Sequence, residues 1–244
     1  MWAVRGRRPL RRDRRLREPV RRPVPVSEQS GVPIVMGSGF YCEYACDPWV
    51  LTATIDHLMQ RIVGDLTQGI DGIRSGIIGE IGINGQERGT LKYVGEMTTM
   101  EERSLRAACR ASVETGAPLS IHQPNRASAV PAILSILKSE NVPPEKVILC
   151  HMSSIWDFSM HLYALERGYR IGYDNFGMMM KNPIDTSIIH LFKKPFSALV
   201  WHQLILSPIF NQHHGFRVVM IITIFARFKK IIIYFLFVLC KNIR

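Results

Sequence analysis

Four ionisable side chains recur at equivalent places in successive segments of the sequence. Each lies near the carboxyl end of an apolar run that we expect to be a strand: Glu80, His122, His151 and Asp174. In GIIGEIGING (76–85), Glu80 stands among isoleucines, and burying an ionised carboxylate there is costly unless a partner compensates its charge. Two histidines and a carboxylate that converge form a ligand set for a divalent metal ion, with Zn²⁺ as the leading candidate.

The elements that must position these residues alternate between strand and helix. They are, in chain order, 31–41 (strand), 48–66 (helix), 75–82 (strand), 99–115 (helix), 117–123 (strand), 127–140 (helix), 146–152 (strand), 154–167 (helix) and 169–177 (strand). Thr99 with Glu102 fits a capping box. The alternation predicts βαβ units and a parallel sheet, and the continuous apolar runs predict strands covered on both faces. Because parallel strands end on one face, the four side chains are expected to meet there.

The positive charge of the chain is concentrated near its ends. The net charge is +11, yet ten arginines lie within residues 1–30 and the middle of the chain is nearly balanced. The charge therefore describes the tails, and no nucleic-acid partner is predicted for the domain. Residues 1–30 are predicted to be a disordered Arg/Pro-rich tail, because their prolines break the amphipathic helix of a mitochondrial presequence.

Residues 183–244 form an atypical apolar and basic tail, predicted to lie outside the α/β domain. Within 216–240, Arg227, Lys229 and Lys230 split the apolar sequence into two runs of about ten residues, whereas a transmembrane helix needs about 20. No confident transmembrane segment is predicted. The five cysteines include no CxxC pair and accompany no secretory signal, which indicates reduced thiols in a cytoplasmic protein. Cys42 and Cys46 could be metal ligands, but a lone CxxxC spacing is a weak signal.

Five ordered motifs resemble strands three to seven of the phosphotriesterase-related branch of the amidohydrolase superfamily. They are GVPIVMGSGFY (31–41), GIIGEIG (76–82), GAPLSIHQ (116–123), VILCHM (147–152) and YRIGYDNFG (169–177). IGEIG is the most diagnostic of them. The resemblance implies an α/β fold, a (β/α)8 TIM-type barrel of which about five βα units are present. It makes residues 31–182 a partial, apparently truncated, metal-dependent hydrolase domain.

The resemblance also implies a chemistry for the residues at the strand ends. It implies that Glu80 bridges two metal ions, usually zinc, and that His122 and His151 are ligands. Metal-activated water would then attack a small-molecule ester or amide, N-acetyltaurine-like in animal members. Arg126, in QPNR after the third predicted strand, is a weaker candidate for binding a substrate anion, with a solvated loop arginine as the alternative. Asp174 is a similar weak candidate that could instead cap a turn or orient a neighbour.

Two ligand groups of the resembled family are absent from the sequence. Its first strand ends in an HxH pair, which occurs nowhere in this chain, and no apolar run ending in aspartate follows Gly177. Strands one, two and eight are therefore expected to be missing. The sequence predicts either a zinc-dependent hydrolase with an incomplete metal centre or an inactive member that acts at most as a metal-binding or interaction protein. A basic binder of nucleic acids or membrane surfaces is the alternative from another class.

Overall fold

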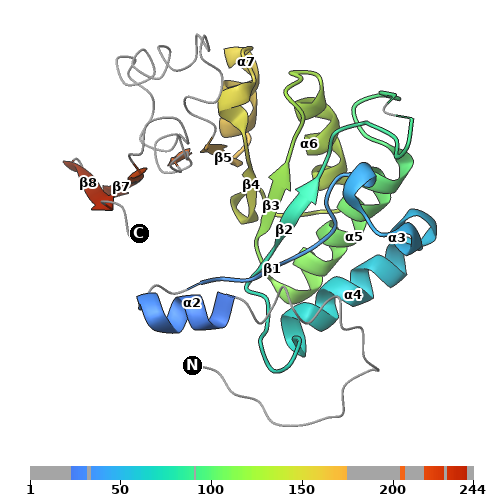
Figure 1. The fold of residues 1–244 in the computed structure, drawn as a ribbon. Helices are drawn as coiled ribbons and strands as arrows, with labels where there is room; N and C mark the ends of the chain where they lie inside the picture. The colour runs from blue at the N-terminus through green and yellow to red at the C-terminus, as the bar shows by residue number, and fades with distance from the viewer. Residues whose placement is uncertain are drawn as a thin grey trace.

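The computed structural model describes residues 23–31, 34–90 and 92–174, together with the backbone of three further strands at 204–206, 217–227 and 230–240. The described part is a mainly parallel sheet whose connections contain helices (Figure 1). The strands lie in the sheet in their sequence order, which is how successive βα units of a barrel are arranged. The predicted α/β class and its parallel sheet are confirmed.

The strands of the sheet are β1 (Gly37–Ser38), β2 (Ile77–Gly82), β3 (Leu119–His122), β4 (Val147–Leu149), β5 (Arg170–Tyr173), β6 (Leu204–Leu206), β7 (Arg217–Arg227) and β8 (Lys230–Cys240). The α-helices are α2 (Pro23–Ser30), α3 (Pro48–Thr52), α4 (Ile55–Thr67), α5 (Thr99–Thr115), α6 (Ala129–Ser139) and α7 (Phe158–Leu165). Neighbouring strands from β1 to β6 pair in parallel, and β6, β7 and β8 pair antiparallel. β1 to β5 correspond to the five predicted strands.

The two faces of the sheet differ in burial. On β3, Leu119 and Ile121 are completely buried, whereas Ser120 and His122 between them are partly exposed. The buried side chains belong to the main hydrophobic core, which joins the sheet to helices such as α5 and α6. Helices pack on the face that carries Leu119 and Ile121, whereas the other face carries the partly exposed side chains of Ser120 and His122. We call this second face the open face.

Helix α5 has the predicted bounds but a different N-terminal cap. Thr98, not Thr99, is the N-cap, and it forms the capping box with Glu101 rather than with Glu102. The Glu101 carboxylate also accepts hydrogen bonds from the backbone N–H groups of Glu43 and Gly85. Since those two N–H groups lie in the loops after β1 and β2, a single buried carboxylate joins both loops to the start of the helix.

Three other predicted segments differ from the observed ones. The helix predicted over 48–66 is interrupted, because the Thr54 side chain accepts a hydrogen bond from the backbone N–H of His57 and starts α4 anew. Helix α7 begins only after its N-cap, Asp157, and a short 3₁₀ helix (Met152–Ser154) precedes it. Residues 23–30, predicted to be disordered, form α2, in which no residue is buried.

Two predictions about membranes and thiols can be compared with the described residues. None of their helices is long and apolar enough to cross a membrane. The four cysteines whose side chains are described are free and buried: Cys42, Cys46, Cys109 and Cys150. The fifth, Cys240, and the side chains of the tail predicted over 183–244 lie outside the described residues.

Candidate metal centre

Glu80, His122 and His151 meet on the open face, from the adjacent strands β2 and β3 and from the end of β4. Glu80 Oε2 lies 3.7 Å from Nδ1 of His122, and Glu80 Oε1 lies 3.2 Å from Nε2 of His151. The two imidazole rings stand edge to face with their centroids 4.6 Å apart. One donor atom from each residue falls within 4.8 Å of the other two. The sequence therefore predicted correctly that these three side chains converge.

This donor set fits a divalent ion of the zinc type. Two imidazole nitrogens and one carboxylate oxygen are typical zinc ligands. The side chains are only about one-fifth to one-third exposed, at 33% for Glu80, 21% for His122 and 18% for His151. Among the described residues, Glu80, His122 and His151 form the group of His, Cys, Asp or Glu side chains that could hold a metal ion. Cys42 and Cys46 do not belong to this group.

Gly82, the last residue of the IGEIG motif, has a structural role that explains why it is glycine. Gly82 is paired with His122 across β2 and β3, and a Cβ atom added to it would lie 2.1 Å from the backbone nitrogen of Cys42. Glycine is therefore required for the segment after β1 to pass close to the end of β2. That approach brings Tyr41 next to His122, with their ring centroids 4.8 Å apart.

His151 is placed by an unusual backbone conformation and by Asp174. Its φ angle is +62°, in the left-handed region that residues other than glycine seldom adopt. Asp174 Oδ1 accepts a hydrogen bond from the backbone N–H of His151 at 3.0 Å and lies 2.8 Å from its Nδ1. When Nδ1 carries the proton donated to Asp174, Nε2 is the nitrogen that faces Glu80 and can bind an ion. Asp174 thus orients a neighbour, one of the roles left open for it by the sequence.

The three residues strongly perturb one another's protonation. The hydrogen bond with His151 is the largest influence on Glu80 and lowers its pKa despite burial. The pKa of His122 is lowered as well, mainly because burial disfavours its charged form, and the positive charge of His151 adds to that effect. Burial opposes protonation of His151, but hydrogen bonds to Asp174 and Glu80 outweigh it and raise the pKa to about 9. Such opposed shifts in one small cluster are typical of functional sites.

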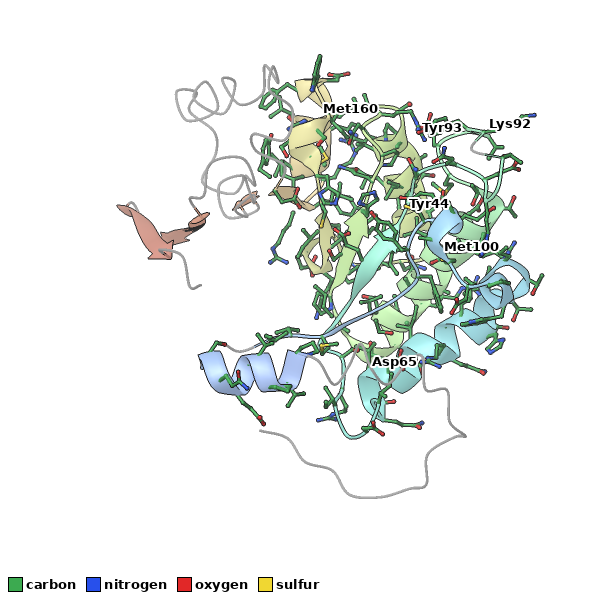
Figure 2. All side chains as sticks on the ribbon, viewed as in Figure 1. Tyr44, Asp65, Lys92, Tyr93, Met100 and Met160 are labelled. Atoms are coloured by element: carbon green, nitrogen blue, oxygen red, sulfur yellow. The ribbon has the colours of Figure 1, made fainter. Side chains whose placement is uncertain are left out.

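Tyr41 is a residue of this site that the sequence analysis did not single out. Its hydroxyl lies 3.2 Å from the ring nitrogens of His122, and burial raises the pKa of the phenol. The ring of Tyr44 packs edge to face on Tyr41. Tyr44 and Tyr93 lie toward the end to which the strand arrows point, whereas Asp65 lies toward the other end (Figure 2). The available signal was the place of Tyr41 at the end of the first predicted strand, 31–41.

Arg126 holds a loop in the structure. Its Nη2 donates to the carbonyls of Asn84, Gly95 and Glu96 at 2.9, 3.1 and 3.3 Å. Its Nε lies 3.4 Å from Glu96 Oε2, and the guanidinium stacks on Tyr93 at 5.0 Å from the ring centroid. These contacts join the loop after β3 to the loop after β2. Anion binding by Arg126 stays a prediction, and it would have to coexist with them.

The sequence is similar to phosphotriesterase-type proteins. The sequence model of the phosphotriesterase family matches residues 13–200. A phosphotriesterase-related protein of Nematostella vectensis is 31% identical over 156 residues, which are 63% of this chain and 42% of that protein. An N-acetyltaurine hydrolase of Xenopus tropicalis is 30% identical over 160 residues, or 64% of this chain and 43% of that protein. This chain therefore spans less than half the length of these relatives.

Solved structures show the same relationship in the fold. A phosphotriesterase homology protein from Escherichia coli, complexed with phosphate in its active site, aligns with a TM-score of 0.63 and 25% identity, over 75% of this chain and 60% of that one. A lactonase from Listeria monocytogenes aligns with a TM-score of 0.61 and 23% identity, over 76% of this chain and 60% of that one. The parallel sheet with its helices thus corresponds to a large part of a TIM-type barrel.

Proposed function

The chain belongs to the phosphotriesterase family, and we propose that it carries a zinc-binding half-site of a hydrolase that cleaves small-molecule esters or amides. The observation that supports this most directly is the convergence of Glu80, His122 and His151 on the open face. We assign the hydrolase-like domain to residues 31–182, in the cytoplasm, with 1–30 and 183–244 as tails.

Glu80, His122 and His151 would hold the ion, and a bound Zn²⁺ supplies Lewis-acid polarisation of the scissile carbonyl and a lowered pKa for bound water. The other residues have roles of their own. Asp174 keeps a proton at Nδ1 of His151 and so directs Nε2 toward the ion. Tyr41 covers the ring of His122 with its phenol in the neutral, hydrogen-bonding form.

The names of the relatives support a proposal for the substrate class. Proteins called N-acetyltaurine hydrolase share about 30% identity with this chain, so we propose an N-acetyltaurine-like acyl amide as substrate. This chain covers less than half of those relatives, and its sequence contains neither an HxH pair nor, after Gly177, an apolar run that ends in aspartate. The second candidate is therefore an inactive metal-binding or interaction protein built on the same half-site.

Metal analysis of the purified full chain tests the half-site. We expect zinc to co-purify or to bind after dialysis, and Glu80→Ala to lose that zinc while keeping the circular-dichroism spectrum of the wild type. The proposal fails if folded wild-type protein binds no zinc or if Glu80→Ala binds it equally well. Incubation of the zinc-loaded chain with N-acetyltaurine then separates the candidates: taurine release identifies the hydrolase, and zinc binding without turnover identifies the inactive member.

A further inference from the structure

A cavity of about 370 Å³ lies at the start of α5, apart from the candidate metal centre. Its walls come from α3, from the loops after β1 and β2, and from the first turns of α5, and Glu80, His122 and His151 do not line it. Cavities of this size hold small organic molecules in many proteins. The proposed hydrolase chemistry leaves this cavity without a role.

Arg103 brings a positive charge to the cavity wall. Its Nη2 donates to the carbonyl of Leu51, which ties α5 to α3. Its Nε is buried and has no hydrogen-bond partner among the described residues, and none of their carboxylates forms an ion pair with the guanidinium. A buried donor on a charged group is costly when it has no acceptor. Arg103 is therefore suited to bind an acidic group.

Glu43 and Glu87 bring two negative charges to the same cavity. Glu43 Oε1 accepts a hydrogen bond from the backbone N–H of Arg88 at 3.1 Å, and Glu87 Oε2 accepts one from the hydroxyl of Thr90 at 3.3 Å. Both glutamates are partly buried. Within the described part of the chain, neither carboxylate pairs with a lysine or arginine side chain. Opposite charges thus line one cavity without contacting one another.

Methionines supply an apolar part of the cavity wall. Met97 packs against the main hydrophobic core, and Met100, which is 2% exposed, belongs to a second cluster with Val50 and Leu58. Figure 2 labels Met100 beside α5. Methionine is flexible and adapts to apolar groups of different shapes. The cavity therefore combines a cationic group, an anionic pair and an apolar surface.

We propose that this cavity binds a small zwitterion, an α-amino acid with an apolar side chain of about the size of leucine. The ligand carboxylate accepts from the guanidinium of Arg103, and the ligand ammonium lies beside Glu43 and Glu87. The apolar side chain of the ligand contacts Met97 and Met100. The competing explanation is that water alone solvates these charges, as it does for most charged side chains near a protein surface.

Equilibrium dialysis of the full chain with isotope-labelled L-leucine, near neutral pH, tests the proposal. Two analogues act as competitors: 4-methylpentanoate lacks the ammonium group, and 3-methylbutylamine lacks the carboxylate. We expect saturable binding of L-leucine, and each analogue to compete at least about tenfold less well than unlabelled L-leucine. Absence of saturable binding, or an analogue that competes as well as L-leucine, would overturn the proposal.

Substitutions assign each charge of the ligand to its side of the cavity. Arg103→Gln should lose the preference for L-leucine over 3-methylbutylamine. The double variant Glu43→Gln and Glu87→Gln should lose the preference over 4-methylpentanoate, while glutamine at position 43 can still accept from the N–H of Arg88. If Arg103→Gln does not fold, because its guanidinium also holds Leu51, the double variant decides. A folded double variant with the full wild-type preference refutes the proposal.

Two controls exclude indirect explanations. Arg110→Gln and Glu114→Gln change charges on the same helix but outside the cavity, and both should bind L-leucine as the wild type does. A loss in these variants equal to that in Arg103→Gln would count against a specific site. Amino acids also bind zinc, so the dialysis is repeated with a metal chelator. Binding that disappears with the chelator would belong to a metal ion and overturn this inference, whereas unchanged binding supports it whether or not the proposed zinc site exists.

Discussion

Protonation of one buried histidine is expected to make the stability of this fold depend on pH. His161 on α7 is completely buried, with Nε2–H donating to the Ile155 carbonyl at 2.9 Å and Nδ1 accepting from the hydroxyl of Tyr173. Both nitrogens are satisfied only in the neutral ring. Burial is the main cause that lowers the pKa of His161, to about 4 from its ordinary 6.5, and the hydrogen bond to Ile155 and the charge of Asp157 oppose it only in part.

The direction of the effect follows from proton binding in the two states. Between about pH 6.5 and pH 4 the unfolded chain protonates this histidine and the folded chain does not, so the unfolded state binds more protons and stability rises with pH. The contribution is fully present above the unfolded pKa and is lost as the pH falls toward the folded pKa. Lowering the pH from about 7.5 to about 4.5 should cost about 2.5 kcal/mol through this one residue.

Urea unfolding followed by circular dichroism at several pH values measures this effect. Other groups also titrate in this range, so the decisive quantity is the difference between the wild type and His161→Gln, which keeps a donor and an acceptor but does not titrate. The variant should be less stable than the wild type near neutral pH and lose about 2.5 kcal/mol less on acidification. Equal pH dependence of the two proteins would refute the assignment of a neutral, buried His161.

Three other substitutions probe how the site is built. Asp174→Asn replaces the carboxylate that orients the ring of His151, and should weaken zinc binding about tenfold or more in a chelator competition. Unchanged zinc affinity would exclude that role for Asp174. Gly82→Ala places a Cβ 2.1 Å from the backbone of Cys42 and should lower the unfolding free energy by about 1 to 3 kcal/mol, whereas Gly64→Ala, with no atom within 4 Å of the added Cβ, should be neutral or stabilising. Arg126→Ala should lower the unfolding free energy by about 2 kcal/mol and speed proteolysis of the loop after β2; a loss confined to binding of an anionic substrate would instead support its predicted substrate role.

Local sequence signals were sufficient to predict the central strands β2 and β3 and the helix α5 between them. Strands β2 and β3 lie inside the predicted ranges 75–82 and 117–123, because a short apolar run that is bounded by glycine or proline favours a buried strand over a helix. Helix α5 was predicted with its observed bounds. The capping box was shifted by one residue, because TTMEE offers two Thr–Glu pairs of the same spacing.

The choice between those two pairs depends on distant parts of the chain. The carboxylate at position 101 reaches the N–H groups of Glu43 and Gly85, which are 58 and 16 residues away. A buried carboxylate that satisfies these donors in addition to the cap is favoured over one that would satisfy the cap alone. The information that decides the register of this helix start is therefore tertiary, and no inspection of five consecutive residues could have supplied it.

The candidate site also has features that the sequence could predict and features that depend on tertiary contacts. The convergence of Glu80, His122 and His151 could be predicted because topology alone determines the edge of a parallel sheet at which the strands end. The parts that could not be predicted are those that depend on a backbone angle or on close contact between segments. The left-handed backbone at His151 is one, since it accompanies an imidazole whose Nε2 lies 3.2 Å from Glu80 Oε1.

The described contacts that arrange Glu80, His122 and His151 lie between β1 and Asp174, which directly follows β5. Gly82 admits the loop that brings Tyr41 to His122, and Asp174 fixes His151. Each contact joins neighbouring strands, or strand ends two apart, so the triad depends on local strand register more than on closure of a whole barrel. We therefore expect the proposed zinc binding and the proposed turnover to be separable in experiments on this chain. A protein that binds zinc tightly through Glu80 yet releases no taurine would be fully consistent with the geometry described above.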